Sequence, residues 1–165
     1  MQEEYKMNHT ISILVTNESG VLSRIVDLFS GRGYNIESLT VAPTLDRAFS
    51  KVTIVTKGNE AALEQINKQL NRLIPVIKVM DLPVSDAIEA EMAIVKIHAK
   101  DEDRAQILSI AHTTDSKIID VNDKNYTILT VGNDKSINAL IELLRPFGIK
   151  DLVRSGKVAM SKSAN

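Results

Sequence analysis

Between residues 9 and 30 the spacing of apolar residues changes from two to about 3.6, and this change constrains the fold more than any other feature. Ile11, Ile13 and Val15 are separated by single residues, which is typical of a strand over His9–Val15. Apolar residues then recur every three or four positions, which is typical of a helix over Gly20–Ser30. A strand therefore leads through a short loop directly into a helix.

The remainder of the first half completes a βαββαβ order. Residues 34–43 are rich in β-branched side chains, and residues 50–56 alternate again, so we predict two strands that form a hairpin. Asn59 precedes an apolar helical stripe and is its expected N-cap, while Pro75 ends that helix. Residues 76–82 are the fourth predicted strand.

The second half repeats the same order with little residue identity. Its predicted strands and helices alternate as in the first half, and carboxylates are the expected helix caps. In order, we predict a strand at Met92–Ala99, a helix capped by Asp101 or Asp103, strands at Lys117–Val121 and Tyr126–Val131, a helix capped by Asp134, and a strand at Ile149–Val153.

Two copies of one element order predict an α+β protein with two tandem ferredoxin-like βαββαβ domains of about 75 residues each. We expect a tail at residues 1–7, a first domain at 8–82, a linker at 83–90 and a second domain at 91–165. A small sheet with helices on only one face leaves the other face and an edge strand open. We therefore expect a homodimer in which the N-terminal sheets meet.

Composition disfavours several classes of protein. The 20 basic residues are balanced by 21 acidic residues, and only 4% of residues are aromatic, so a nucleic-acid binder is not expected. The absence of cysteine excludes disulfides and thiolate chemistry. The polar N-terminus lacks the apolar core of a secretory signal, and no apolar run reaches membrane-spanning length, so we expect a cytoplasmic protein without a membrane segment.

The loop between the first strand and helix is the best candidate for a ligand site. Ser19 is the expected N-cap, and Gly20 lacks a Cβ atom, so a small anion such as a carboxylate can approach the first-turn N–H groups. The alternative is a tight turn in which glycine supplies only backbone freedom. The loop alone favours this alternative.

No catalytic constellation is recognisable. His9, His98 and His112 are scattered without metal-ligand spacing, and we expect His9 and His98 to be hydrogen-bonded structural groups. Carboxylates cluster only at helix starts and turns, where we expect them to act as caps, while Glu37 and Asp81 lie in predicted strands without an obvious acid or base partner. We therefore predict neither catalytic residues nor a metal site.

A long stretch of the chain is similar to a known family. Residues 33–44, Gly-Tyr-Asn-Ile-Glu-Ser-Leu-Thr-Val-Ala-Pro-Thr, resemble the signature of the regulatory (small) subunit of acetohydroxyacid synthase, also called acetolactate synthase. Residues 17–25, 117–121 and 146–149 and the run Arg154–Met160 fit the same family. The resemblance extends over nearly all of residues 8–160.

This resemblance implies an N-terminal ACT domain that binds valine and a second ferredoxin-like domain, in a subunit that has no cofactor of its own. Such subunits associate with a catalytic large subunit that holds thiamine diphosphate, Mg²⁺ and usually FAD. They activate it and confer valine feedback inhibition in branched-chain amino-acid biosynthesis. The implied effector site contains Asn17, Gly20 and neighbouring helix amides of one subunit, with Asn35 of the partner. Ser19 departs from the family pattern, since many relatives have proline before this glycine.

The chemistry of valine agrees with that site. Helix amides suit its carboxylate, and the amide oxygens of Asn17 and Asn35 can accept from its ammonium group. Val21, Leu22 or Ile36 can pack on its isopropyl group. The sequence does not separate valine from isoleucine or leucine, which differ by a methylene or by branching. An alternative function is a free-standing amino-acid sensor, although the chain shows neither a helix-turn-helix pattern nor a basic patch.

Overall fold

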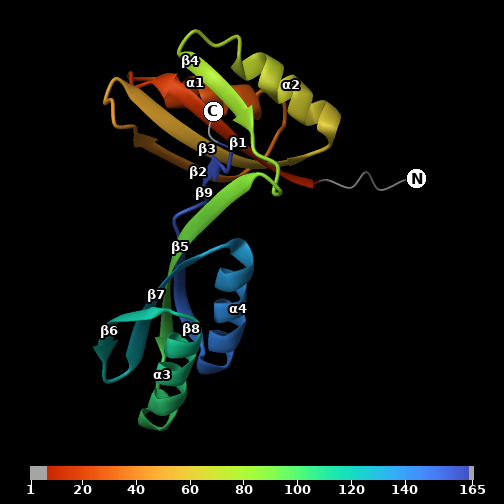
Figure 1. Ribbon diagram of the computed structural model, residues 1–165. Coiled ribbons are helices and arrows are strands. Elements are labelled where there is room, and N and C mark those ends of the chain that lie inside the picture. The colour runs from red at the N-terminus through yellow and green to blue at the C-terminus, as the bar shows by residue number, and fades with distance from the viewer. Residues whose placement is uncertain (1–6, 164–165) are drawn as a thin grey trace, which may run out of the picture. The chain divides into compact units, whose positions relative to one another are not determined.

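The computed structural model describes residues 7–163 and divides into two compact units. Among the described residues, the first unit contains residues 7–88 together with residues 157–163, and the second contains Glu89–Gly156. Each unit has four strands and two α-helices in βαββαβ order, and the chain adds a short strand near its C-terminal end (Figure 1). The predicted α+β class with two ferredoxin-like repeats is confirmed.

The first unit is a four-stranded antiparallel sheet with both helices on one face (Figure 1). Its strand order is β2-β3-β1-β4. In chain order, its elements are β1 (Met7–Thr16), α1 (Val21–Ser30), β2 (Ile36–Pro43), β3 (Phe49–Gly58), α2 (Glu60–Leu70) and β4 (Val76–Asp81).

Alternation along the central strands assigns each side chain to one face of this sheet. Ile11 and Ile13 of β1 pair with Ile54 and Val52 of β3, and all four are buried under the helices. Residues one position along point to the opposite face, because side chains alternate along a strand. That helix-free face is mainly polar at its centre, where Thr10, Ser12 and Thr53 lie.

A C-terminal segment, Lys157–Ser163, crosses this helix-free face, although no strand was predicted there. It contains β9 (Val158–Ser161), which pairs with β5 and contacts β1. Ala159 is buried against Leu82 and Ala87. Asp86 anchors the end of the segment, since its carboxylate accepts from the Ser161 and Ser163 hydroxyls at 2.7 and 2.9 Å. These two hydrogen bonds lower the pKa of Asp86.

The second unit has the equivalent strand order, β6-β7-β5-β8, with its own buried core. In chain order, its elements are β5 (Ala87–His98), α3 (Arg104–Thr113), β6 (Lys117–Asn122), β7 (Asn125–Gly132), α4 (Asp134–Leu144) and β8 (Ile149–Arg154), with 3₁₀ turns at Asp101–Asp103 and Arg145–Phe147. Arg154 is fixed in this unit by Glu91 and Asp134, at 2.6 and 2.8 Å.

Several predicted boundaries differ from the structure. β1 begins at Met7, which the prediction placed in the tail, and residues 1–6 lie outside the described part. β5 begins at Ala87, inside the segment predicted as the linker 83–90, because the start of this strand packs against Ala159. The C-terminal residues from Lys157 group with the first unit rather than with the second.

The predicted helix caps are confirmed only in part. Asn133, not Asp134, accepts the hydrogen bond from the first turn of α4, while Asn59 caps α2 as predicted. Asp103 occupies the N-cap position of α3 without bonding its amides, because its carboxylate accepts instead from the Lys100 N–H.

Candidate functional site

The N-terminus of α1 has no side-chain cap. Gly20, rather than the predicted Ser19, occupies the N-cap position, with a left-handed φ of 83°. By contrast, Asn59 and Asn133 cap α2 and α4, each accepting a backbone N–H at 2.9 Å. The left-handed backbone at this turn favours glycine, which has no side chain to close the helix end. The first turn of α1 therefore keeps free donors.

The space beside this helix end is open. No atom lies within 4 Å of where a Cβ of Gly20 would stand, and the first turn contains no acidic residue. The Val21 and Arg24 N–H groups bond to Glu18 and Gly20 carbonyls, so the uncapped amides are those of Leu22 and Ser23 between them. Amides and helix dipole together suit a carboxylate.

Asn17 precedes this turn with a fixed side-chain orientation. Its backbone N–H donates to the Ala48 carbonyl at 2.8 Å, and its Nδ2 donates to the Arg47 carbonyl at 2.9 Å. A carbonyl only accepts hydrogen bonds, so the atom facing Arg47 must be the NH₂ group. The Oδ1 atom of Asn17 is thereby left as an acceptor.

Asn35 is oriented in the same way at the start of β2. Its Nδ2 donates to Glu37 at 2.8 Å, and its backbone carbonyl accepts from the Thr56 hydroxyl at 2.7 Å. The pKa of Glu37 is lowered, first by this bond and then by Lys57 at 3.4 Å. The ionised carboxylate is an acceptor only, so the Oδ1 of Asn35 is also left as an acceptor.

Asn17 and Asn35 lie at opposite ends of the sheet in one chain. Asn17 bonds to Ala48 just before β3, whereas Ile36, the residue after Asn35, pairs with Thr56 near the end of β3. Ala48 and Thr56 are eight residues apart along an extended strand, which corresponds to about 25 Å. One chain therefore cannot bring both asparagines to a single small ligand.

The three apolar residues predicted to line the site differ in accessibility. Val21 is only 6% exposed and packs in the core with Ile25 and Phe29, so little of its surface is accessible at the open helix end. Val21, the first residue of the amphipathic helix α1, faces the core. Leu22 is 37% exposed beside the open helix end, while Ile36 is partly buried at the other end of the sheet.

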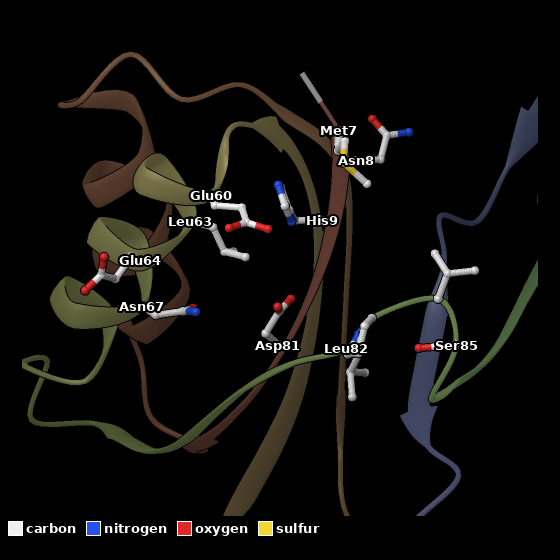
Figure 2. Close-up of a pocket in the computed structure, with 12 residues that line it drawn as sticks. Met7, Asn8, His9, Glu60, Leu63, Glu64, Asn67, Asp81, Leu82 and Ser85 are labelled. Atoms are coloured by element: carbon white, nitrogen blue, oxygen red, sulfur yellow. The ribbon is translucent and has the colours of Figure 1, made fainter. Parts of the chain in front are cut away.

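A surface cavity of about 570 Å³ lies elsewhere in the first unit, between β1, α2 and the chain after β4 (Figure 2). Glu60, Glu64 and Asp81 contribute carboxylates to it, and Leu63 and Leu82 contribute apolar surface. Glu64 is paired with Lys68 at 2.6 Å. None of the six predicted site residues lines this cavity, which sequence reasoning missed because its lining comes from β1, from α2 and from the chain around the end of β4.

The histidines are not gathered into a site in the described residues. His9 donates from Nε2 to the Gly58 carbonyl at 3.0 Å, as expected of a structural imidazole. His98 differs, because its buried Nδ1 has no partner among the described residues. Within residues 7–163, no cluster of three or more histidines and carboxylates is placed to hold a metal ion. No helix in the same range is long and apolar enough to cross a bilayer.

Comparisons with known proteins cover both units. Residues 11–78 match the model of the "AHAS small subunit-like ACT domain", and residues 90–163 match the "Small subunit of acetolactate synthase". The chain is 43% identical over 154 residues to a probable acetolactate synthase small subunit of Archaeoglobus fulgidus, covering 93% of this chain and 96% of the relative. It is 44% identical over 155 residues to the small subunit of Aquifex aeolicus, covering 93% and 81%.

A solved structure agrees with this relationship. The crystal structure of the acetolactate synthase small subunit of Thermotoga maritima superposes with a TM-score of 0.88 at 34% identity, covering 96% of this chain and 99% of that one. The order of strands, the match to an ACT-domain model and the sequence identity over nearly the whole length all indicate the same family. The chain belongs to the family of acetolactate synthase small subunits.

Proposed function

We propose that this chain is a valine-responsive regulatory subunit, which activates a separate catalytic subunit of acetolactate synthase and makes it sensitive to valine. The observation that carries the proposal is the open N-terminus of α1 at Gly20, with an oriented amide oxygen on Asn17 beside it. This arrangement offers donors for a carboxylate and an acceptor for an ammonium group. Both groups are present in every free amino acid.

The second asparagine of the site is proposed to come from another copy. β2 is an edge strand, and its last residues pair with the start of β3, at the end of the sheet where Asn17 lies. Antiparallel pairing of two β2 strands would place the start of one β2 beside the end of the other. Asn35 of one copy would then lie at the same end of the joined sheet as Asn17 and Gly20 of its partner.

The expected affinity suits a metabolite sensor. Burying an isopropyl group contributes roughly 1.5 to 3 kcal/mol, and a carboxylate at a helix N-terminus contributes about 0.3 to 2 kcal/mol. Hydrogen bonds to charged groups add about 1.5 to 3 kcal/mol each, while the loss of ligand freedom opposes binding. We therefore expect dissociation constants in roughly the micromolar to millimolar range.

The reaction itself is assigned to the partner. Thiamine diphosphate, Mg²⁺ and FAD are expected on the catalytic subunit, and we assign none of their ligands to this chain. Valine held between two copies favours the arrangement that completes both halves of the site, and a ligand can shift an equilibrium only through such differential contacts. The chain acts in this proposal by changing the conformation of its partner.

The test combines the chain with its catalytic subunit and measures acetolactate formation with and without valine. We expect the chain to raise activity and valine to lower it. Gly20→Asp places a carboxylate where the ligand carboxylate would bind, and Asn35→Ala removes an acceptor for the ammonium group, so both variants should activate normally without responding to valine. Unchanged activity in all mixtures would refute the function, and unaltered calorimetric binding of valine by the variants would refute the site.

A further inference from the structure

The backbone of Lys157 is held between two hydroxyl groups of β2. The Lys157 N–H donates to Ser38 Oγ at 3.0 Å, and the Lys157 carbonyl accepts from Thr40 Oγ1 at 3.0 Å. Both hydrogen bonds are partly buried. Both the N–H and the carbonyl of Lys157, the first residue of the C-terminal segment, are therefore bound by side chains of β2.

The two hydroxyls belong to the strand that begins beside Asn35. Ser38 and Thr40 pair with Val55 and Thr53, so they face the helix-free side of the sheet. They lie three and five residues after Asn35, and the register of β2 shifts between Ile36 and Ser38. A shift of this edge strand at Asn35 would also displace Ser38 and Thr40, because both belong to β2, the continuous strand that follows Asn35.

Lys157 is also the first residue after the second unit. The chain enters that unit after Ile88 and leaves it at Gly156. Two residues separate Lys157 from Arg154, which Glu91 and Asp134 fix in the second unit. Ser155 is held as well, since its hydroxyl accepts from the Met92 N–H at 3.0 Å. Only Ser155 and Gly156 therefore lie between Lys157, which the β2 hydroxyls bind, and Arg154, which is anchored in the second unit.

We propose that Ser38 and Thr40 are positioning residues that transmit effector-dependent movement of β2 to the second unit through Lys157. This inference rests on the proposed binding of valine at Asn35. An allosteric response requires an element whose contacts differ between states, and the paired hydrogen bonds make the C-terminal segment follow β2. Removing them should separate effector binding from effector response.

The test uses the double variant Ser38→Ala/Thr40→Val in the complex with the catalytic subunit. Valine binding to the variant, measured by calorimetry, should stay within about threefold of the wild type. The valine concentration for half-maximal inhibition should rise by about tenfold or more. In hydrogen-exchange measurements, valine should slow exchange of the C-terminal segment in the wild type and not in the variant.

Matched variants distinguish the relay from a general effect on the sheet. Thr53→Val removes a hydroxyl from the neighbouring strand, opposite Thr40, without a hydrogen bond to Lys157, and should be inhibited like the wild type. Ser38→Thr and Thr40→Ser retain the hydroxyls and should restore inhibition. If the double variant does not fold, Thr40→Val alone is measured, with a smaller effect in the same direction.

Two results would overturn the inference. If valine inhibits the double variant as it inhibits the wild type, the two hydrogen bonds do not couple valine binding to inhibition. If the double variant loses valine binding and inhibition in parallel, the hydrogen bonds only support the valine site. Failure of the proposed function looks different, because wild-type protein would then neither bind valine nor change the activity of the catalytic subunit.

Discussion

At the scale of single residues, the proposed valine site depends on which atom each asparagine presents. Asn17 and Asn35 each donate their NH₂ group to an acceptor of their own chain, and this leaves the two oxygens for an ammonium group. The sequence predicted both residues through family resemblance. It could not predict Arg47 and Glu37 as the groups that orient them, because these contacts depend on a loop conformation and on a bulge in β2.

Glu37 tests this role of orientation. In Glu37→Ala the Asn35 amide is free to rotate, and the lost hydrogen bond is worth about 0.5 to 1.5 kcal/mol. We therefore expect valine affinity to fall by roughly two- to tenfold, as measured by calorimetry. Lys57→Met is the control, because it removes the other partner of Glu37 and keeps the bond to Asn35. Equal losses in both variants would contradict the proposed role.

At the scale of elements, the helices and strands follow the periodicity of the sequence closely. The exceptions have local causes: Gly20 rather than Ser19 is the N-cap residue of α1, and Asn133 rather than Asp134 caps α4. Any of several polar residues can occupy an N-cap, and the backbone angles decide among them. β9 was missed because a four-residue strand has too little alternation to recognise, and its pairing with β5 depends on distant residues.

The caps give a prediction for stability. Asn59→Ala removes a cap that bonds to the Ala62 N–H, so the free energy of unfolding should fall by about 1 kcal/mol. Ser19→Ala should change it by less than about 0.5 kcal/mol, because Ser19 does not cap α1. Urea unfolding followed by circular dichroism measures both. A larger loss for Ser19→Ala would mean that the helix end is closed rather than open.

At the scale of the whole molecule, the two βαββαβ repeats could be predicted, but the division of the chain could not. The C-terminal segment returns to the first unit, where it crosses the helix-free sheet face. That face was expected to be available for self-association. Because this face is partly covered, the proposed pairing of copies uses the edge strand β2, which also accounts for the separation of Asn17 from Asn35.

The most direct measurement of the central claim is valine binding by a mixed dimer. A Gly20→Asp chain and an Asn35→Ala chain, carrying different tags, are coexpressed and purified as a pair. In a site shared between copies, one of the two sites then contains both defects and the other contains neither. We predict that the mixed dimer binds one valine with wild-type affinity, half the stoichiometry of the wild type, while each variant alone binds none. Absence of binding in the mixed dimer would contradict the account.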